Sequence, residues 1–179
     1  MSFPTQNVFV HEGSWDSITR KHPAMDWMEK YTNNFDARNF DIPASEWHAS
    51  TFAIQKSDGQ VVSGADKAWA AVKEIYSPFT ANLHEPIFLY CSETENGWQM
   101  FGIANVFVNL QGQAGPGEQK VKSVEGKEWD AVLPTAFYLE YVREDGGIKL
   151  NKTKIFGDPT PAVGLLLQRG VMKPEDLVK

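Results

Sequence analysis

The sequence contains one cysteine, Cys91, among its 179 residues. No disulfide bond can therefore form within the chain, and a zinc site built on several cysteines is excluded. We expect Cys91 to be a small buried side chain in a strand rather than a nucleophile. A single cysteine is compatible with a reducing compartment, so we expect a cytoplasmic protein.

Long hydrophobic runs and concentrated positive charge are also missing. No apolar stretch approaches the roughly 20 residues of a membrane-spanning helix, and the first residues lack the regions of a signal peptide. With 17 Lys and Arg against 23 Asp and Glu, the formal net charge is −6. An acidic chain without a stripe of basic residues binds nucleic acid and anionic membranes poorly. We therefore expect neither as a partner.

The motifs of several enzyme classes are absent from the sequence. It has no HExxH zinc motif, no P-loop, no GxGxxG after a strand and no serine-centred nucleophile elbow. Its histidines are not at metal-ligand spacing; they are His11, His22, His48 and His84. We expect no metal site and no cofactor.

The first half of the chain carries two helical patterns. Apolar side chains recur at helical spacing over residues 24–35 and again over 65–76, where Ser-Pro follows and ends the helix. A short helical stretch is expected within 36–47. Strands are expected at 51–55 and 61–63, separated by an Asp-Gly turn.

The second half is typical of a β-sheet. Strands are expected at 83–93 and 98–110, joined by a turn containing Asn-Gly, and at 131–142 and 148–156, joined by a second Gly-containing turn. Between the hairpins, residues 111–127 are rich in Gly, Gln and charge, as in long functional or disordered loops. The fold class expected is α+β, a strongly curved antiparallel sheet wrapped by N-terminal helices into a cone-shaped half-barrel.

We expect one folded domain with two appendages. Residues 1–21 show weak periodicity and are interpreted as an N-terminal arm, and residues 22–158 as the cone domain. Residues 159–179 are interpreted as a C-terminal tail that packs on the body or on a partner chain.

Four stretches of the chain resemble the nuclear transport factor 2-like, or SnoaL-like, superfamily: residues 27–36, 58–64, 82–84 and 145–158. Its members include ketosteroid isomerases, scytalone dehydratases, limonene epoxide hydrolases and polyketide cyclases. The resemblance implies a cone whose mouth admits a small hydrophobic molecule, and a homodimer formed through the outer face of the sheet. Function varies widely on this scaffold, so the activity depends on the site residues.

The resemblance implies four candidate catalytic residues. His84 opens a strand where scytalone dehydratases place a catalytic histidine, and an imidazole exchanges protons near neutral pH. Tyr31 matches a tyrosine that points into the cone of ketosteroid isomerases, and Tyr138 falls near their oxyanion-stabilising acid. Glu140 shares the face of Tyr138 as a second acid or base. The alternatives are a turn-capping role for His84, core packing for Tyr31, and an outer, solvated face for the other two.

Six further residues are candidates for substrate binding: Trp27, His48, Asn105, Asn109, Asn151 and Phe156. The asparagines alternate with apolar or lysine side chains along their strands, and a buried amide needs a hydrogen-bond partner. An outward face is the alternative for Asn105 and Asn109, and a capping role is the alternative for His48. Asp36 and Arg38, after the first helix, are interpreted as a surface ion pair near the mouth.

Two features of the relatives are missing. The base of ketosteroid isomerases would fall near Ile54-Gln55, and a second histidine of scytalone dehydratases near residues 107–109. Neither is present. The sequence predicts a cofactor-independent isomerase, dehydratase or cyclase that acts by general acid–base catalysis on a hydrophobic polycyclic or terpenoid-like substrate, as in secondary metabolism. The alternative is a non-catalytic cone that binds a ligand or a protein.

Overall fold

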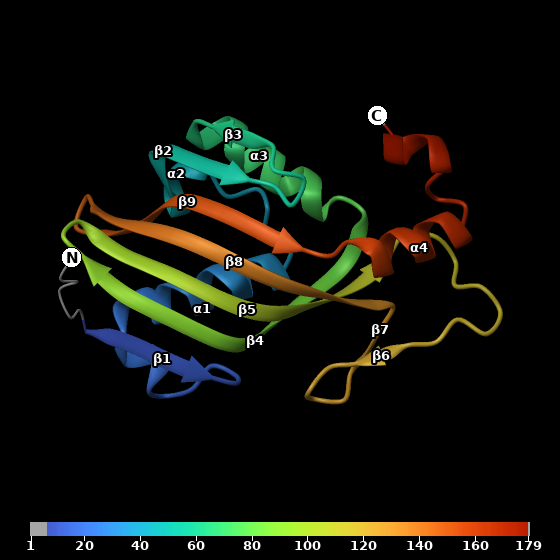
Figure 1. The fold of residues 1–179 in the computed structure, drawn as a ribbon, viewed down its shortest axis with the longest axis horizontal. Coiled ribbons are helices and arrows are strands. Elements are labelled where there is room, and N and C mark those ends of the chain that lie inside the picture. The colour runs from blue at the N-terminus through green and yellow to red at the C-terminus, as the bar shows by residue number, and fades with distance from the viewer. Residues whose placement is uncertain (1–6, 179) are drawn as a thin grey trace, which may run out of the picture.

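The computed structural model describes residues 7–178, and its main element is a seven-stranded sheet with the order β1-β4-β5-β8-β9-β2-β3 (Figure 1). The strands are β1 (Val8–Glu12), β2 (His48–Gln55), β3 (Val61–Ser63), β4 (Phe79–Thr94), β5 (Gly97–Leu110), β8 (Ala131–Glu144) and β9 (Gly147–Gly157). Neighbouring strands run antiparallel except for the β2–β9 pair, which is parallel. The sheet does not close on itself, and the predicted α+β half-barrel is confirmed.

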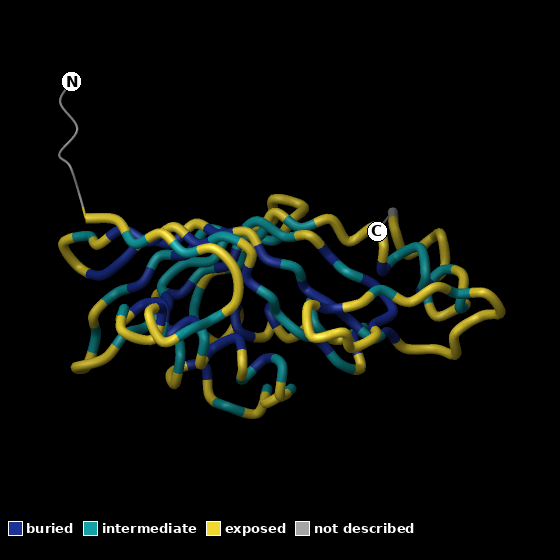
Figure 2. The backbone as a smooth tube through the Cα atoms, turned by 90° about the horizontal axis from the view of Figure 1, so that it is seen from below, coloured by how far each residue is buried: buried dark blue, intermediate teal, exposed yellow. Residues whose placement is uncertain are grey.

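Helices α1 and α3 cover one face of the sheet, here called the inner face. The helices are α1 (Pro23–Asp36), α2 (Ala44–Trp47), α3 (Ala65–Tyr76) and α4 (Thr160–Gln168), with short 3-10 turns η1 (Thr19–Lys21) and η2 (Pro174–Val178). The predicted apolar stripes of α1 and α3 are buried together with the inner face of the sheet. Figure 2 shows buried residues, in dark blue, along the interior of the molecule and exposed residues, in yellow, along its outer loops. Both long helices are thus held by their apolar faces.

Side chains alternate across the sheet, as strand geometry requires. On β8, Phe137, Leu139 and Tyr141 are buried with the helices, and Tyr138 and Glu140 between them point to the other, outer face. On β4, Cys91 is buried, and burial raises the pKa of its thiol to about 12. That side chain is therefore an inert part of the core.

The β8–β9 hairpin has the tight turn that its sequence predicts. Asp145 and Gly146 connect the strands with φ values of 51° and 75°. Two consecutive residues with positive φ match the twist of the flanking strands, and Asp-Gly is a preferred pair for this turn. Its pairing partners, Glu144 and Gly147, close the loop.

The N-terminal segment contributes more structure than an arm. Val8–Glu12 forms β1, which pairs with β4 and becomes an edge of the sheet; residues 1–6 lie outside the described part of the chain. The loop at 111–127 contains β6 (Val121–Lys122), which pairs with β7 (Glu128–Trp129). This small ribbon places Trp129 against Phe107 on the outer face.

The C-terminal tail packs on the body through α4, at one end of the sheet (Figure 1). Ala162 and Leu166 of this helix are buried against β5 and β8. Just after the helix, the Arg169 guanidinium pairs with Glu118 and Asp130, and all three side chains are at most 6 % exposed. The pairs connect the end of α4 to the loop between β5 and β6 and to the start of β8. We call these three residues and Lys120, which pairs with Asp130, the Arg169 cluster.

Candidate active site

A cavity of about 280 Å3 lies between the inner face and the helices. Every layer of the fold lines it: α1 and α3, strands β4, β5, β8 and β9, and α4 at one end. Its walls are mainly aliphatic and aromatic, with Phe35, Phe79, Leu133, Phe137 and Leu166 as examples. A concave apolar space with a few polar groups is typical of a small-molecule site.

Three polar side chains meet at the cavity wall. His84 Nδ1 lies 2.6 Å from Asp36 Oδ1, and His84 Nε2 lies 2.8 Å from the hydroxyl of Tyr76. His84 and Tyr76 both line the cavity. Asp36 also accepts hydrogen bonds from the Asn82 side-chain amide at 2.9 Å and from the backbone N–H of His84.

These contacts determine which nitrogen of His84 carries the proton. An ionised carboxylate only accepts hydrogen bonds, so Nδ1 donates its proton to Asp36. In the neutral imidazole, Nε2 is then the basic atom, and Tyr76 O–H donates to it. A carboxylate behind an imidazole fixes the tautomer and stabilises the imidazolium that forms when Nε2 takes a proton.

The arrangement depends on a sharp turn after α1. The helix ends at Asp36, and Arg38 adopts a positive φ of 57° two residues later. From there the Arg38 guanidinium donates to the Tyr76 carbonyl at 3.2 Å and to Asn82 Oδ1 at 3.4 Å. It thereby connects the end of α3 and the start of β4 to the end of α1. Asn82 and His84 share one side of β4 by strand alternation, and both bind Asp36.

A second tyrosine–histidine pair lies on the same helix-lined side. The Tyr31 hydroxyl is 2.8 Å from His48 Nε2, and His48 Nδ1 is 3.0 Å from the Ala44 carbonyl. A carbonyl only accepts, so Nδ1 holds the proton and Tyr31 donates to Nε2. Burial lowers the pKa of His48 to about 4, which keeps this imidazole neutral at physiological pH. Tyr31 lines the cavity, and His48 lies behind it against Phe52.

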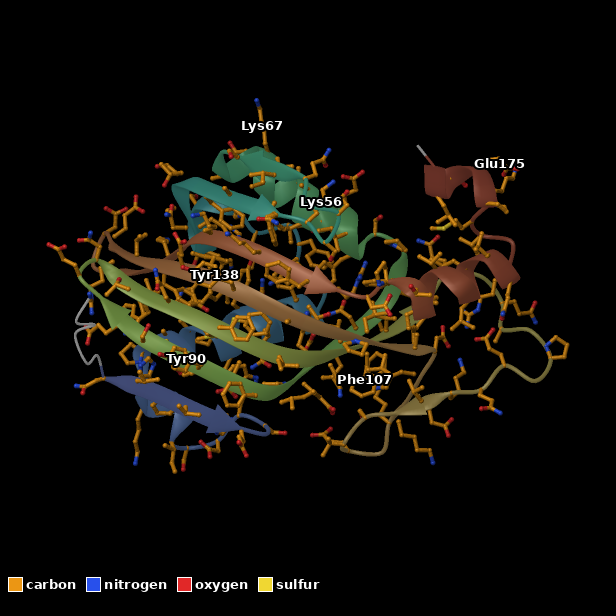
Figure 3. All side chains as sticks on the ribbon, viewed as in Figure 1. Lys56, Lys67, Tyr90, Phe107, Tyr138 and Glu175 are labelled. Atoms are coloured by element: carbon orange, nitrogen blue, oxygen red, sulfur yellow. The ribbon has the colours of Figure 1, made fainter. Side chains whose placement is uncertain are left out.

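Of the four predicted catalytic residues, His84 and Tyr31 line the cavity, and Tyr138 and Glu140 do not. The inner face of β8 is taken by apolar side chains, so strand alternation turns these two outward. There the Tyr138 hydroxyl donates to Glu140, which also pairs with Lys152. Figure 3 shows Tyr138 on the face of the sheet away from α1. The inward placement expected from the resemblance is therefore wrong.

The predicted binding asparagines also lie outside the cavity. Ala104 and Val106 line the cavity, so strand alternation points Asn105 and Asn109 to the outer face. There the side-chain oxygen of Asn109 accepts a hydrogen bond from the backbone N–H of Asp130. Asn151 sits at an irregularity between β8 and β9 and accepts a 2.6 Å hydrogen bond from a threonine of β2. This irregularity removes it from the inward position that alternation with the lysines predicts.

The two remaining predicted binding residues, Phe156 and Trp27, do not line the cavity. Thr153, two residues after Asn151 on β9, lines the cavity. Phe156 is 51 % exposed and lies outside the cavity. Trp27 is buried and stacks on Tyr31 at 4.8 Å, so it supports the cavity wall without forming it.

Sequence reasoning missed two residues of the site, Asp36 and Tyr76. Asp36 was interpreted as the surface partner of Arg38, but no ion pair between them is found in the described structure. Its carboxylate binds His84, and Arg38 binds Asn82 and Tyr76 instead. Tyr76 belongs to the apolar stripe of α3, where a tyrosine ring ordinarily packs in the hydrophobic core. The sequence carried one local signal for this site: strand alternation puts Asn82 and His84 on the same side of their strand. It did not point to Asp36 or Tyr76.

Two general features of the described residues bear on the class of protein. None of their helices is both long enough and apolar enough to span a bilayer. Residues 7–178 also contain no group of three or more His, Cys, Asp or Glu arranged to hold a metal ion.

Comparisons with known proteins find similarity in structure alone. No family model matches this sequence, and no curated protein sequence does. A protein from Novosphingobium aromaticivorans assigned as a scytalone dehydratase superposes with a TM-score of 0.61 at 10% identity, over 79% of this chain and 85% of its own. An NTF2-like protein of unknown function from Pseudomonas putida has a TM-score of 0.55 at 11% identity, over 78% and 87%.

A third similar structure is a hexachlorocyclohexane dehydrochlorinase, LinA-type3, from Novosphingobium barchaimii. It superposes with a TM-score of 0.52 at 16% identity, over 80% of this chain and 91% of its own. Identities this low establish a shared fold and leave the reaction open. At the level of the fold, the resemblance expected from the sequence is thus confirmed: this chain shares the fold of these structures, one of which is named NTF2-like.

Proposed function

We propose that this protein is a cofactor-independent enzyme of the lyase or isomerase type, which removes a proton from a carbon atom of a neutral, apolar small molecule. The observation that carries the proposal is the Asp36–His84–Tyr76 chain of hydrogen bonds at the wall of an apolar cavity. An oriented imidazole with a carboxylate behind it is a general base matched to neutral pH.

The charge of the cavity wall argues against an anionic substrate. No lysine or arginine is among the described residues that line the cavity, so an anionic substrate would have no counter-ion there. Desolvating an unpaired charge is costly. The volume of about 280 Å3 lies near the lower end for small-molecule sites and favours a compact member of the polycyclic or terpenoid-like class.

Elimination is the reaction type that the structural neighbours favour. Two of them are named as a dehydratase and a dehydrochlorinase, names that describe the loss of water and of hydrogen chloride. In such a reaction a base takes a proton from one carbon, its electron pair forms a double bond, and a group leaves from the adjacent carbon. His84 would form the base, and Asp36 would stabilise the imidazolium.

Tyr31 would orient the substrate. Its hydroxyl proton is used in the bond to His48, so the lone pairs of the oxygen remain free to accept a hydrogen bond. A substrate hydroxyl would fit this acceptor. The fixed neutral state of His48 maintains the orientation over the physiological pH range.

The test uses nitrobenzisoxazole, a neutral bicyclic compound that opens to a coloured phenolate when a base removes its ring proton. We expect the protein to accelerate the opening with saturation kinetics. We expect an analogue with an added carboxylate on its benzene ring to react at least about tenfold more slowly, because burying an unpaired charge costs more than 1.4 kcal/mol.

Absence of acceleration over buffer would contradict the proposal, and so would equal rates for the neutral and anionic compounds. Saturable binding of the neutral compound without any turnover would support the alternative, a non-catalytic ligand-binding cone. The two compounds differ only in one charged group, so the anionic analogue serves as the matched control.

The outer face of the sheet supports a homodimer as the assembly of this enzyme. Large apolar side chains are exposed there on neighbouring strands: Tyr90, Phe101, Ile103 and Phe156. Figure 3 shows Tyr90 and Tyr138 on this face, opposite α1. Contiguous apolar patches mark association surfaces. We expect sedimentation to show a dimer that Phe101→Glu converts to a folded monomer; a monomeric wild-type protein would rule the dimer out.

A further inference from the structure

The basic nitrogen of His84 is not free in this structure. Its Nδ1 proton is directed at Asp36, and Nε2 accepts the hydrogen bond from Tyr76 at 2.8 Å. An imidazole nitrogen has one lone pair, which lies in the ring plane, so a substrate proton cannot reach Nε2 while Tyr76 occupies it. Either the phenol moves away during the reaction, or the proton passes through it.

Packing argues that Tyr76 stays in place. Its ring lies between Phe35, Phe40 and Phe79, with centroid distances of 4.9, 6.0 and 5.8 Å. Its carbonyl is held by Arg38, and the residue ends α3 directly before the chain turns into β4. A side chain in a close-packed aromatic cluster moves only if its neighbours move too.

We infer that Tyr76 is a further catalytic residue, whose phenol oxygen takes the substrate proton while its own proton passes to His84. The inference rests on the proposed function and deepens it. Asp36, His84 and Tyr76 then have the roles of the acid, base and hydroxyl in a catalytic triad, except that the hydroxyl oxygen removes a proton and forms no bond to carbon.

The relay balances in atoms and electrons. The proton on the substrate carbon bonds to Tyr76 Oη, and the electron pair of the broken C–H bond forms the double bond. The former Tyr76 proton bonds to His84 Nε2, giving an imidazolium beside the Asp36 carboxylate. The leaving group departs with its bonding electron pair. The imidazolium proton then returns through Tyr76 to that group, which restores both side chains.

The acidity of Tyr76 makes the two proton transfers interdependent. Burial, together with the nearby Asp36 carboxylate, raises the pKa of this phenol above its ordinary value of 10.0. A free phenolate is therefore not populated near neutral pH. Tyr76 can accept a substrate proton only as it gives its own to His84, so the relay needs the imidazole in the same step.

Tyr76→Phe distinguishes the relay from direct attack by His84. The variant keeps the ring and its packing and removes only the hydroxyl, so Nε2 becomes exposed to the cavity. With nitrobenzisoxazole as the probe, we expect the rate to fall by about 100-fold, the scale of a lost general base. Tyr141→Phe is the matched control, because it removes a buried phenol hydroxyl whose residue does not line the cavity.

A Tyr76→Phe variant as fast as the wild type, or faster, would overturn the relay and show that His84 acts directly. That result leaves the proposed function standing, provided that loss of His84 still removes the activity. A protein that keeps its activity without His84 would instead overturn the proposed function itself.

A solvent isotope measurement gives a second readout. The probe's own proton is bound to carbon and does not exchange with water, whereas the Tyr76 hydroxyl proton does. If both move together, the wild-type reaction is slower in heavy water, and the residual reaction of Tyr76→Phe is not. Equal rates of the wild-type protein in the two solvents would exclude the relay.

Discussion

Replacing His84 with glutamine is expected to lower the rate of nitrobenzisoxazole opening by at least about 100-fold. Glutamine has a similar reach and can still hydrogen-bond to Asp36, but its amide nitrogen is not basic. Asp36 would remain satisfied by Asn82 and by the backbone N–H of residue 84. The fold is therefore retained and the base is lost. Initial rates and a thermal unfolding curve of the same samples measure both.

The matched control is His11→Gln. His11 lies on β1 at the sheet edge and bonds to the Ser14 carbonyl, away from the cavity. We expect its rate to equal that of the wild type. A His84→Gln protein that retains half of the wild-type rate would show that proton removal does not depend on the His84 imidazole.

Replacing Arg169 with methionine is expected to lower the free energy of unfolding by about 3 kcal/mol. The Arg169 side chain is 2 % exposed, and its guanidinium pairs with Glu118 and lies 2.9 Å from Asp130. Methionine fills much of the space but leaves the buried Glu118 carboxylate without its ion-pair partner and the Asp130 carboxylate with Lys120 as its remaining cation. Chemical denaturation of the variant and the wild type measures the difference.

The exposed pair of Lys30 with Asp26 provides the control for this substitution. The lysine side chain is 64 % exposed, so Lys30→Met is expected to change the free energy of unfolding by less than about 1 kcal/mol. An Arg169→Met variant as stable as Lys30→Met would show that the Arg169 cluster does not hold α4 in place.

The same cluster predicts how stability depends on pH. Burial alone would raise the pKa of Asp130, but hydrogen bonds from Arg169, the Leu110 amide and Lys120 outweigh it and lower the pKa to about 2. Because the folded pKa is below the ordinary value, this stabilisation is present above about pH 4 and is lost as the pH falls toward 2. In Arg169→Met, the loss of stability over that range is expected to be smaller.

The sequence was a good guide wherever one local period decides the structure. The apolar stripes of α1 and α3 recur at helical spacing, and both helices form over those residues. The alternation along β8 separated an apolar face from one with Tyr138 and Glu140, and that division is observed. Which of the two faces points inward depends on where the helices pack. The resemblance implied that the face with Tyr138 and Glu140 points inward, and this was wrong.

The candidate site was predictable only in part. His84 and Tyr31 line the cavity as proposed from the resemblance, whereas Asp36 and Tyr76 were assigned to the surface and the core. Asp36 and His84 are 48 positions apart, and their contact requires α1 to end beside the start of β4. No local pattern carries that information. Asn151 shows the same limit, since one irregularity in the β8–β9 pairing moves it off the predicted face.

By itself, the sequence determined the order of helices and strands, the two faces of each strand and the apolar character of the interior, because each follows from a local repeat or turn. The tertiary structure alone decided which polar groups meet. The turn at Arg38 brings the ends of α1 and α3 together with the start of β4, and there Asp36, Tyr76 and His84 come within hydrogen-bond distance. A hydrogen bond between side chains on distant elements forms only where the fold places the ends of those elements close together in space, and no local repeat specifies that.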